Sequence, residues 1–129
     1  MTAELRMPFS DLMGVEILEA TAEAVRARMA WRADLCTAAG ILHGGALMAF
    51  ADSVGALCAV LNLPAGHLTS TIESKTNFFR AVREGAVEAV AKPLHVGRST
   101  IVVQTDVRDA AGKRVTQTTQ TQAVLAPPR

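Results

Sequence analysis

The 129-residue sequence has few aromatic side chains, two cysteines and almost no net charge. It contains one tryptophan, four phenylalanines and no tyrosine, and its formal net charge at pH 7 is +1. This balance gives no electrostatic basis for binding nucleic acid, which requires a basic patch or stripe. Because 50% of the residues are apolar, the composition also excludes a disordered chain. We expect one domain over residues 1–129, with a buried core.

The two cysteines, Cys36 and Cys58, lack the spacing of a metal site, and the histidines supply no such spacing either. We therefore expect no metal. The N-terminal segment MTAELRMPFSDL is polar and charged, without the basic start and apolar stretch of a signal peptide. We expect both thiols to be reduced and the protein to be cytoplasmic.

The longest apolar run covers residues 40–62, GILHGGALMAFADSVGALCAVLN. It is long enough to be mistaken for a transmembrane span. Three features argue against a membrane: many small residues, Asp52 and Ser53 at the centre, and no flanking basic cluster. A helix that is apolar all round also fits a buried central helix. We expect this helix from about Gly44 to between Asn62 and Pro64, where helix-breaking residues follow.

Shorter elements surround this helix. Residues 8–13 can form one or two helical turns, with Pro8 suited to the first turn and Gly14 to the end. Residues 30–39 show no clear period and are expected to form a loop. Alternating polarity and β-branched residues predict strands over residues 15–19, 24–29, 69–79, 85–94, 99–108 and 114–125. The Thr/Gln run at 116–122 is expected to form a strand with one polar face.

One apolar helix with about six strands predicts an α+β domain, in which an antiparallel sheet wraps around the helix. A helix this apolar needs more cover than one small sheet provides, so we expect an oligomer. A carboxylate within such a helix is costly unless it is paired, solvated or used. Asp52 lies mid-helix and cannot cap it, which leaves a buried ion pair or a chemical role.

The helix starts with His43-Gly44-Gly45. The first amides of a helix lack partners and carry partial positive charge, and glycine allows another group to approach closely. This geometry suits an oxyanion or a polarised carbonyl oxygen, although Gly-Gly before a helix is often only a turn. We expect His43 to bond the backbone rather than to act as a base.

Gly44 and Asp52 are eight residues apart, which corresponds to a rise of roughly 12 Å along a helix. One helix therefore cannot bring both groups to one small reactive centre. Two antiparallel copies side by side could place the Asp52 of one near the Gly44 amide of the other. The spacing thus predicts two sites across a two-fold axis, provided that both residues act together.

Three segments resemble the hotdog-fold acyl-CoA thioesterases: LHGGALMAFADS at 42–53, TSTIESKTNFFRAVREG at 69–85 and HVGRS at 95–99. The nearest type is the phenylacetate-degradation (PaaI-like) branch, related to the 4-hydroxybenzoyl-CoA thioesterases, and the resemblance runs from about residue 9 to 125. It implies a hotdog fold, with a sheet curled around the central helix. It also implies dimers that often pair into tetramers, and hydrolysis of acyl-CoA with no metal or cofactor.

The same resemblance implies roles for individual residues. Gly44 would polarise the thioester carbonyl, Asp52 would be the general base or the nucleophile, and Thr71 would lie near the attacking water. Some related enzymes place Asn or Gln shortly before the His, whereas residues 36–39 carry no amide. The candidates are Asp52, Gly44, Thr71 and His43 for catalysis, and Gly45, Asn77, Arg80, Arg83 and Arg98 for binding the substrate, the arginines being suited to the CoA phosphates.

Two other functions stay open. A non-catalytic acyl-CoA-binding or regulatory module could share the fold, but it would not need a carboxylate at Asp52. A hydratase or dehydratase would need a histidine near an acid on the helix, and no histidine follows Gly44 until His67. With so few aromatic residues, we expect mainly aliphatic residues and a few phenylalanines to line an acyl pocket.

Overall fold

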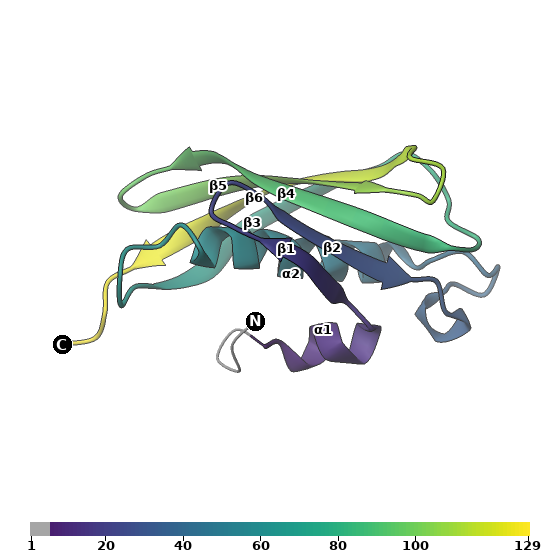
Figure 1. Ribbon diagram of the computed structural model, residues 1–129, viewed down its shortest axis with the longest axis horizontal. Helices are drawn as coiled ribbons and strands as arrows, with labels where there is room; N and C mark the ends of the chain where they lie inside the picture. The colour runs from purple at the N-terminus through teal and green to yellow at the C-terminus, as the bar shows by residue number, and fades with distance from the viewer. Residues whose placement is uncertain (1–5) are drawn as a thin grey trace.

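The computed structural model describes residues 6–129 (Figure 1). Residues 1–5, which open the segment compared above with signal peptides, lie outside the described residues. The elements in order are α1 (Pro8–Met13), β1 (Glu16–Ala20), β2 (Val25–Ala30), the 3-10 turn η2 (Ala33–Leu35), α2 (Gly44–Val60), β3 (Leu68–Phe78), β4 (Ala86–Val96), β5 (Thr100–Arg108) and β6 (Arg114–Leu125). The α+β class and the predicted strands are confirmed, while η2 lies in the stretch expected to be a loop.

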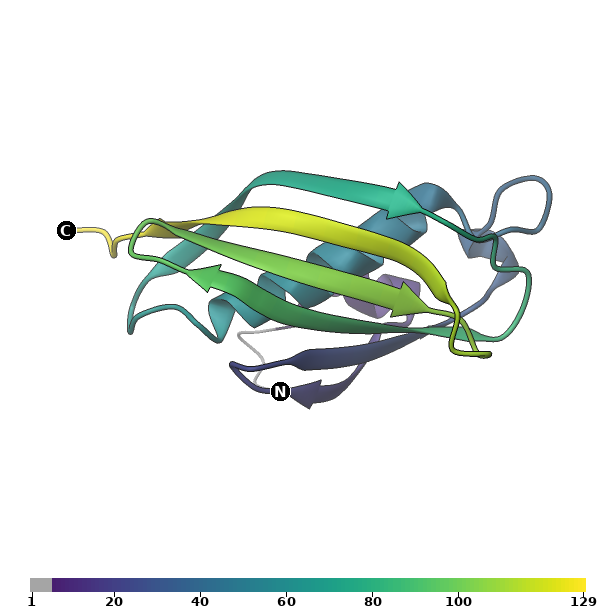
Figure 2. The same ribbon diagram turned by 90° about the horizontal axis from the view of Figure 1, so that it is seen from above.

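The strands form one antiparallel sheet in the order β1-β2-β4-β5-β6-β3. Helix α2 lies across one face of this sheet, and α1 packs against α2 (Figure 1). Figure 2 shows the strand order from above, with β3 at the edge beside β6. The chain crosses from this edge to β4, which lies beside β2, so β3 and β4 are not paired. Because β3 is an edge strand, its outer side is open.

The core lies between α2 and the β2, β4 and β5 part of the sheet. Strand β2 alternates buried and exposed residues as its sequence predicts. The largest fully buried apolar side chains include Phe50, Val54 and Leu57 from α2 and Met29, Val87, Ile101, Val103 and Val107 from the sheet. Burial also raises the pKa of the Cys58 thiol to about 11, so this side chain is neutral and packs as a small hydrophobe.

The expectation that β6 has only one polar face was wrong. Polar residues occupy both of its faces, because the residues that lie under α2 are also polar. The buried set is Thr116, Thr118, Gln120 and Gln122. A polar stripe therefore runs beneath the helix, between the apolar core and the edge strand β3.

One side of α2 is left uncovered by the sheet. Gly45 and Met48 are exposed and Asp52 is half-buried, and spacings of three and four residues place them on one face of the helix. Among residues 6–129, no helix is long and apolar enough to cross a membrane. Asp52 thus lies at the boundary between the buried polar stripe of β6 and the open side of α2.

Candidate active site

Asp52 is held by neutral polar side chains. Its Oδ1 accepts a hydrogen bond from Gln120 Nε2 on β6 at 3.2 Å, and Thr71 Oγ1 on β3 lies 3.5 Å from the same oxygen. Asp52 takes part in none of the ion pairs within residues 6–129. The alternative of a buried ion pair with Arg or Lys is therefore not supported, and the structure brings Thr71 beside Asp52.

The partners of Asp52 belong to a larger hydrogen-bond network. Thr71 Oγ1 donates to Gln122 Oε1 at 2.6 Å, and Gln120 Nε2 donates to the same oxygen at 3.0 Å. Gln122 Nε2 donates to Thr69 Oγ1 at 3.1 Å. Thr69 donates in turn to the carbonyl oxygen of Ala123 at 2.8 Å. The network therefore connects Asp52 to the backbone of β6.

Sequence reasoning missed Gln120 and Gln122. The resemblance directed attention to residues 36–39 for an amide near the site, but the amides beside Asp52 come from β6. A glycine of α2 makes room for one of them. A Cβ added at Gly55 would meet Gln120 Oε1 and would lie 2.7 Å from Gln120 Cδ. The glutamine therefore packs directly against the helix backbone, close to Asp52.

The start of α2 provides a second polar group. His43 is the N-cap residue, and its Nδ1 accepts a hydrogen bond from the Gly45 N–H at 2.7 Å. The prediction that His43 bonds the backbone is confirmed. Gly44 is the first helical residue, so its N–H has no carbonyl one turn earlier in the helix. A Cβ at Gly44 would lie 3.3 Å from the ring of Phe78. Because glycine has no side chain, a narrow space beside the Gly44 N–H stays open.

Within one chain these two groups stay apart. Gly44 begins α2 and Asp52 follows it within the same unbroken helix, which corresponds to roughly 12 Å of rise. Within residues 6–129, the polar side chains beside the Asp52 carboxylate are Gln120, which donates to it, and Thr71, whose Oγ1 lies 3.5 Å away. No histidine is among them, so the requirement for a hydratase is not met there.

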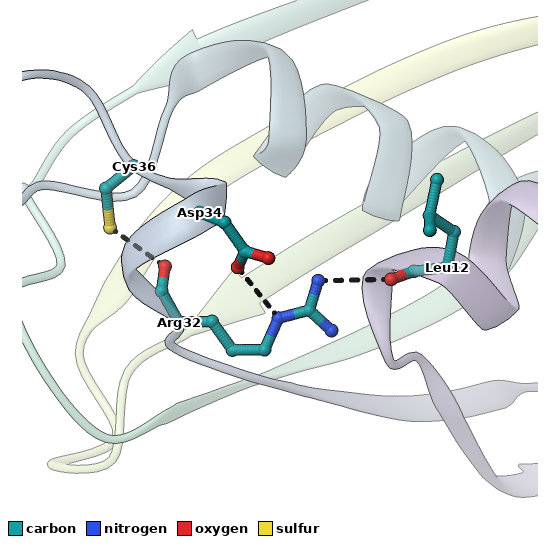
Figure 3. Close-up of polar contacts among 4 residues, drawn as sticks. All are labelled: Leu12, Arg32, Asp34 and Cys36. Carbon is teal, nitrogen blue, oxygen red and sulfur yellow. Dashed lines mark hydrogen bonds and ion pairs between the residues drawn. The ribbon is translucent and has the colours of Figure 1, made fainter.

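A groove of about 400 Å³ lies beside the start of α2, between α1 and η2. Its apolar walls include Phe9, Leu12, Met13 and Leu35, and it reaches His43 and Ala46. Arg32 connects η2 and α1, which form two walls of this groove, through polar contacts (Figure 3). Its Nε lies 3.0 Å from Asp34 Oδ1, and its Nη2 donates to the Leu12 carbonyl oxygen at 3.1 Å. Cys36 Sγ donates to the Arg32 carbonyl oxygen at 3.2 Å.

A basic hollow of about 360 Å³ lies where the chain leaves β3 and enters β6. It is lined by Phe79, Arg80, Lys113 and Arg114. Arg114 is partly neutralised by Asp106, whose Oδ2 lies 3.3 Å from Arg114 Nη2. This hollow lies at the same end of the sheet as the start of α2, because Phe78, at the end of β3, has its ring 3.3 Å from a Cβ placed at Gly44.

The other predicted binding residues have different surroundings. Arg83 lines a hollow with Glu84 and Asp109, whose carboxylates oppose the binding of phosphate. Arg98 lies between β4 and β5, and Figure 2 shows this turn at the opposite end of the sheet from the start of α2. Asn77 is exposed on β3. Arg80 therefore differs from Arg83, because it lines a hollow with other cationic residues and no acidic one.

Comparisons with known proteins all indicate one family. The sequence pattern of the thioesterase superfamily matches residues 39–116. A Bacillus subtilis (strain 168) protein named as an esterase, ComA2, is 33% identical over 125 residues, which cover 95% of this chain and 98% of that protein. The 1,4-dihydroxy-2-naphthoyl-CoA hydrolase of Escherichia coli (strain K12) is 35% identical over 86 residues, 67% of this chain and 63% of that enzyme.

Solved structures agree with these sequence matches. The crystal structure of a thioesterase from Haemophilus influenzae superposes with a TM-score of 0.89 and 29% sequence identity. The superposition covers 94% of this chain and 85% of that one. The expected fold, a curled antiparallel sheet around one central helix, is therefore confirmed.

Proposed function

Because the chain belongs to the thioesterase superfamily, we propose that it hydrolyses an acyl-CoA thioester to a free acid and CoA. The observation that carries this proposal is Asp52, a half-buried carboxylate at the open side of α2 that accepts a hydrogen bond from Gln120. A protein that only binds acyl-CoA has no need for this carboxylate. The Escherichia coli relative, which is by name a hydrolase of a CoA thioester, supports the same substrate class.

The proposed chemistry needs one donor and one carboxylate. The Gly44 N–H at the start of α2 polarises the thioester carbonyl and stabilises the oxyanion that forms on attack. Asp52 either takes a proton from water as the water oxygen bonds to the carbonyl carbon, or attacks that carbon itself to form an anhydride that water then hydrolyses. In both routes the carbon–sulfur bond breaks and CoA leaves as a thiolate. No metal or cofactor enters either route.

A second subunit is part of the proposal, since Gly44 and Asp52 are too far apart within one helix. The edge strand β3 exposes apolar side chains, including Ile72 at 61% and Leu68 at 58%, and an apolar edge invites pairing with another strand. We place two β3 edges side by side, with the open faces of two α2 helices antiparallel. Each dimer then has two sites, and dimers could pair again into tetramers.

The surfaces near Gly44 suggest how the substrate lies. The phosphates of CoA suit the basic hollow of Arg80, Lys113 and Arg114, because charge-assisted hydrogen bonds to phosphate are strong. The apolar groove along α1 suits the acyl group. Its lining of Phe9, Leu12, Met13 and Leu35 favours an apolar acyl chain, and placement in the PaaI-like branch is part of this proposal.

Release of free thiol tests the reaction directly, with short, medium, long and aromatic acyl-CoAs as substrates. We expect turnover by the wild type and a loss of about 100-fold or more in Asp52→Asn, since a general base typically contributes about 10²–10⁴-fold. Glu88→Gln, an exposed carboxylate on β4, is the matched control and should keep wild-type turnover. Full activity in Asp52→Asn would refute the role of Asp52. A wild type that releases no thiol from any acyl-CoA would instead favour the binding module.

A further inference from the structure

Gln120 occupies a position where an apolar residue would be more stable. Its side chain is fully buried, with 0% of its surface exposed. Within residues 6–129, its Oε1 has no hydrogen-bond partner. A buried amide oxygen without a donor destabilises the folded state. Packing therefore does not explain why an amide stands at this position. The hydrogen bond that the Gln120 nitrogen donates to Asp52 does.

The orientation of this amide follows from the backbone of β6. Thr69 donates its hydroxyl proton to the carbonyl oxygen of Ala123, so its own oxygen must accept from Gln122 Nε2. That contact turns Gln122 Oε1 toward Gln120. Gln120 then faces two acceptors, Gln122 Oε1 at 3.0 Å and Asp52 Oδ1 at 3.2 Å. Only its nitrogen fits there, because its oxygen would be repelled by both.

Thr71 completes the arrangement. It donates at 2.6 Å to Gln122, whereas its distance to Asp52 Oδ1 is 3.5 Å. The single hydroxyl proton is therefore committed to Gln122, and a remaining lone pair of Thr71 can accept a hydrogen bond from a nearby water. Gln120 is thus the main donor to the Asp52 carboxylate among the described residues.

We propose that Gln120 is a positioning residue, which fixes one oxygen of the Asp52 carboxylate as a hydrogen-bond acceptor and leaves the other oxygen for the reaction. The effect on catalysis rests on the proposed thioester hydrolysis, but the contact itself does not. Gly55 allows this arrangement, because any side chain there would displace Gln120. The superfamily match ends at residue 116, so Gln120 and Gln122 lie beyond the segment by which the family is recognised.

Gln120→Met tests the proposal, because methionine keeps the length of the side chain but cannot donate a hydrogen bond. We expect kcat for the best acyl-CoA to fall by about 10-fold or more, since hydrogen bonds to charged groups are the stronger ones, while KM changes little. The melting temperature should stay the same or rise, because the unpartnered Oε1 is gone. Gln104→Met, on the outer face of β5, is the matched control. A wild-type kcat in Gln120→Met would overturn the proposal.

Two further measurements separate positioning from a general structural effect. If Gln120 acts through Asp52, the double variant Asp52→Asn/Gln120→Met should be no slower than Asp52→Asn alone. Losses that multiply would refute a role through Asp52. In nuclear magnetic resonance spectra, Asp52→Asn should shift the side-chain amide signals of Gln120 but not those of Gln104. Unchanged Gln120 signals would refute the contact between Gln120 and Asp52, whether or not the protein hydrolyses acyl-CoA. Conversely, a wild type that hydrolyses no acyl-CoA would refute the proposed function but not this contact.

Discussion

At Gly55 of α2, the helix backbone and the Gln120 side chain approach so closely that a methyl group between them would displace one of the two. Alanine in a helix is normally favoured over glycine by about 1 kcal/mol, but overpacking a core costs about 1–3 kcal/mol. We therefore expect Gly55→Ala to lower the free energy of unfolding by roughly 1 kcal/mol. It should also lower kcat, because Gln120 would move away from Asp52. Denaturant unfolding and thiol-release kinetics measure the two effects.

The control for this prediction is the double variant Gly55→Ala/Gln120→Ala, which removes the atoms that the new methyl group would meet. It should be more stable than expected from the sum of the two single changes, while kcat stays low because the donor to Asp52 is lost. A Gly55→Ala protein with wild-type stability and turnover would show that Gln120 can lie elsewhere.

Single residues also show what the sequence can indicate. Asp52 is a candidate because it interrupts an apolar helix, and Thr71 because it lies in a family motif; the structure places the two side by side. Gln120 and Gln122 were missed because polar residues alternate with polar residues in β6, so the pattern does not say which face is buried. Only the pairing with β5, where Gln120 lies opposite the buried Val103, places it under the helix.

At the scale of elements, the end of β3 and the hairpin between β5 and β6 bring Arg80 and Lys113 into one basic hollow. If this hollow binds the CoA phosphates, Arg80→Ala/Lys113→Ala should raise KM for an acyl-CoA by about 10-fold or more. The same acyl group on N-acetylcysteamine lacks phosphates, so its kcat/KM should not change. Steady-state kinetics on the two thioesters, at low and high salt, measure the difference.

Arg98→Ala is the control, since this residue lies at the other end of the sheet. It should leave both thioesters unaffected. An equal loss for the CoA and N-acetylcysteamine thioesters in Arg80→Ala/Lys113→Ala would mean that the hollow supports the fold rather than the phosphates.

Element boundaries followed the sequence patterns closely, because long helices and alternating strands carry a strong periodic signal. The position of β3 at the sheet edge could not be predicted from these patterns, because the short connection from β3 to β4 resembles a hairpin in sequence. The 3-10 turn at Ala33–Leu35 was also missed, because three residues are too few to show a period.

At the scale of the whole molecule, two features of the isolated chain agree with the dimer proposed above. The open side of α2 exposes Met48 next to Asp52, and β3 leaves an apolar edge unpaired within the sheet. Sequence alone predicted the need for cover from the composition of the helix, and it predicted the two-fold arrangement from the spacing of Gly44 and Asp52. Neither pattern says which surfaces meet, because the residues of an interface carry the same periodic signal as those of a core.

Subunit complementation tests whether the sites are shared between chains. Asp52→Asn removes the carboxylate, and Gly44→Pro removes the N–H at the first helical position, which proline tolerates. The extended backbone of His43 also suits a residue before proline. Each variant alone should be nearly inactive, because Asp52→Asn lacks the base and Gly44→Pro lacks the hydrogen-bond donor. Thiol release by the separately purified variants provides these two baselines.

In a mixed dimer, the intact Asp52 of one subunit meets the intact Gly44 of the other, so one site of the two is complete. Random co-assembly should therefore restore about one quarter of wild-type activity, because about half of the dimers are mixed. If Gly44 and Asp52 acted within one chain, neither variant would hold a complete site and the mixture would stay inactive. Mixed dimers isolated with two different affinity tags make this test direct, and their inactivity, or full activity in a wild-type monomer, would contradict a shared site.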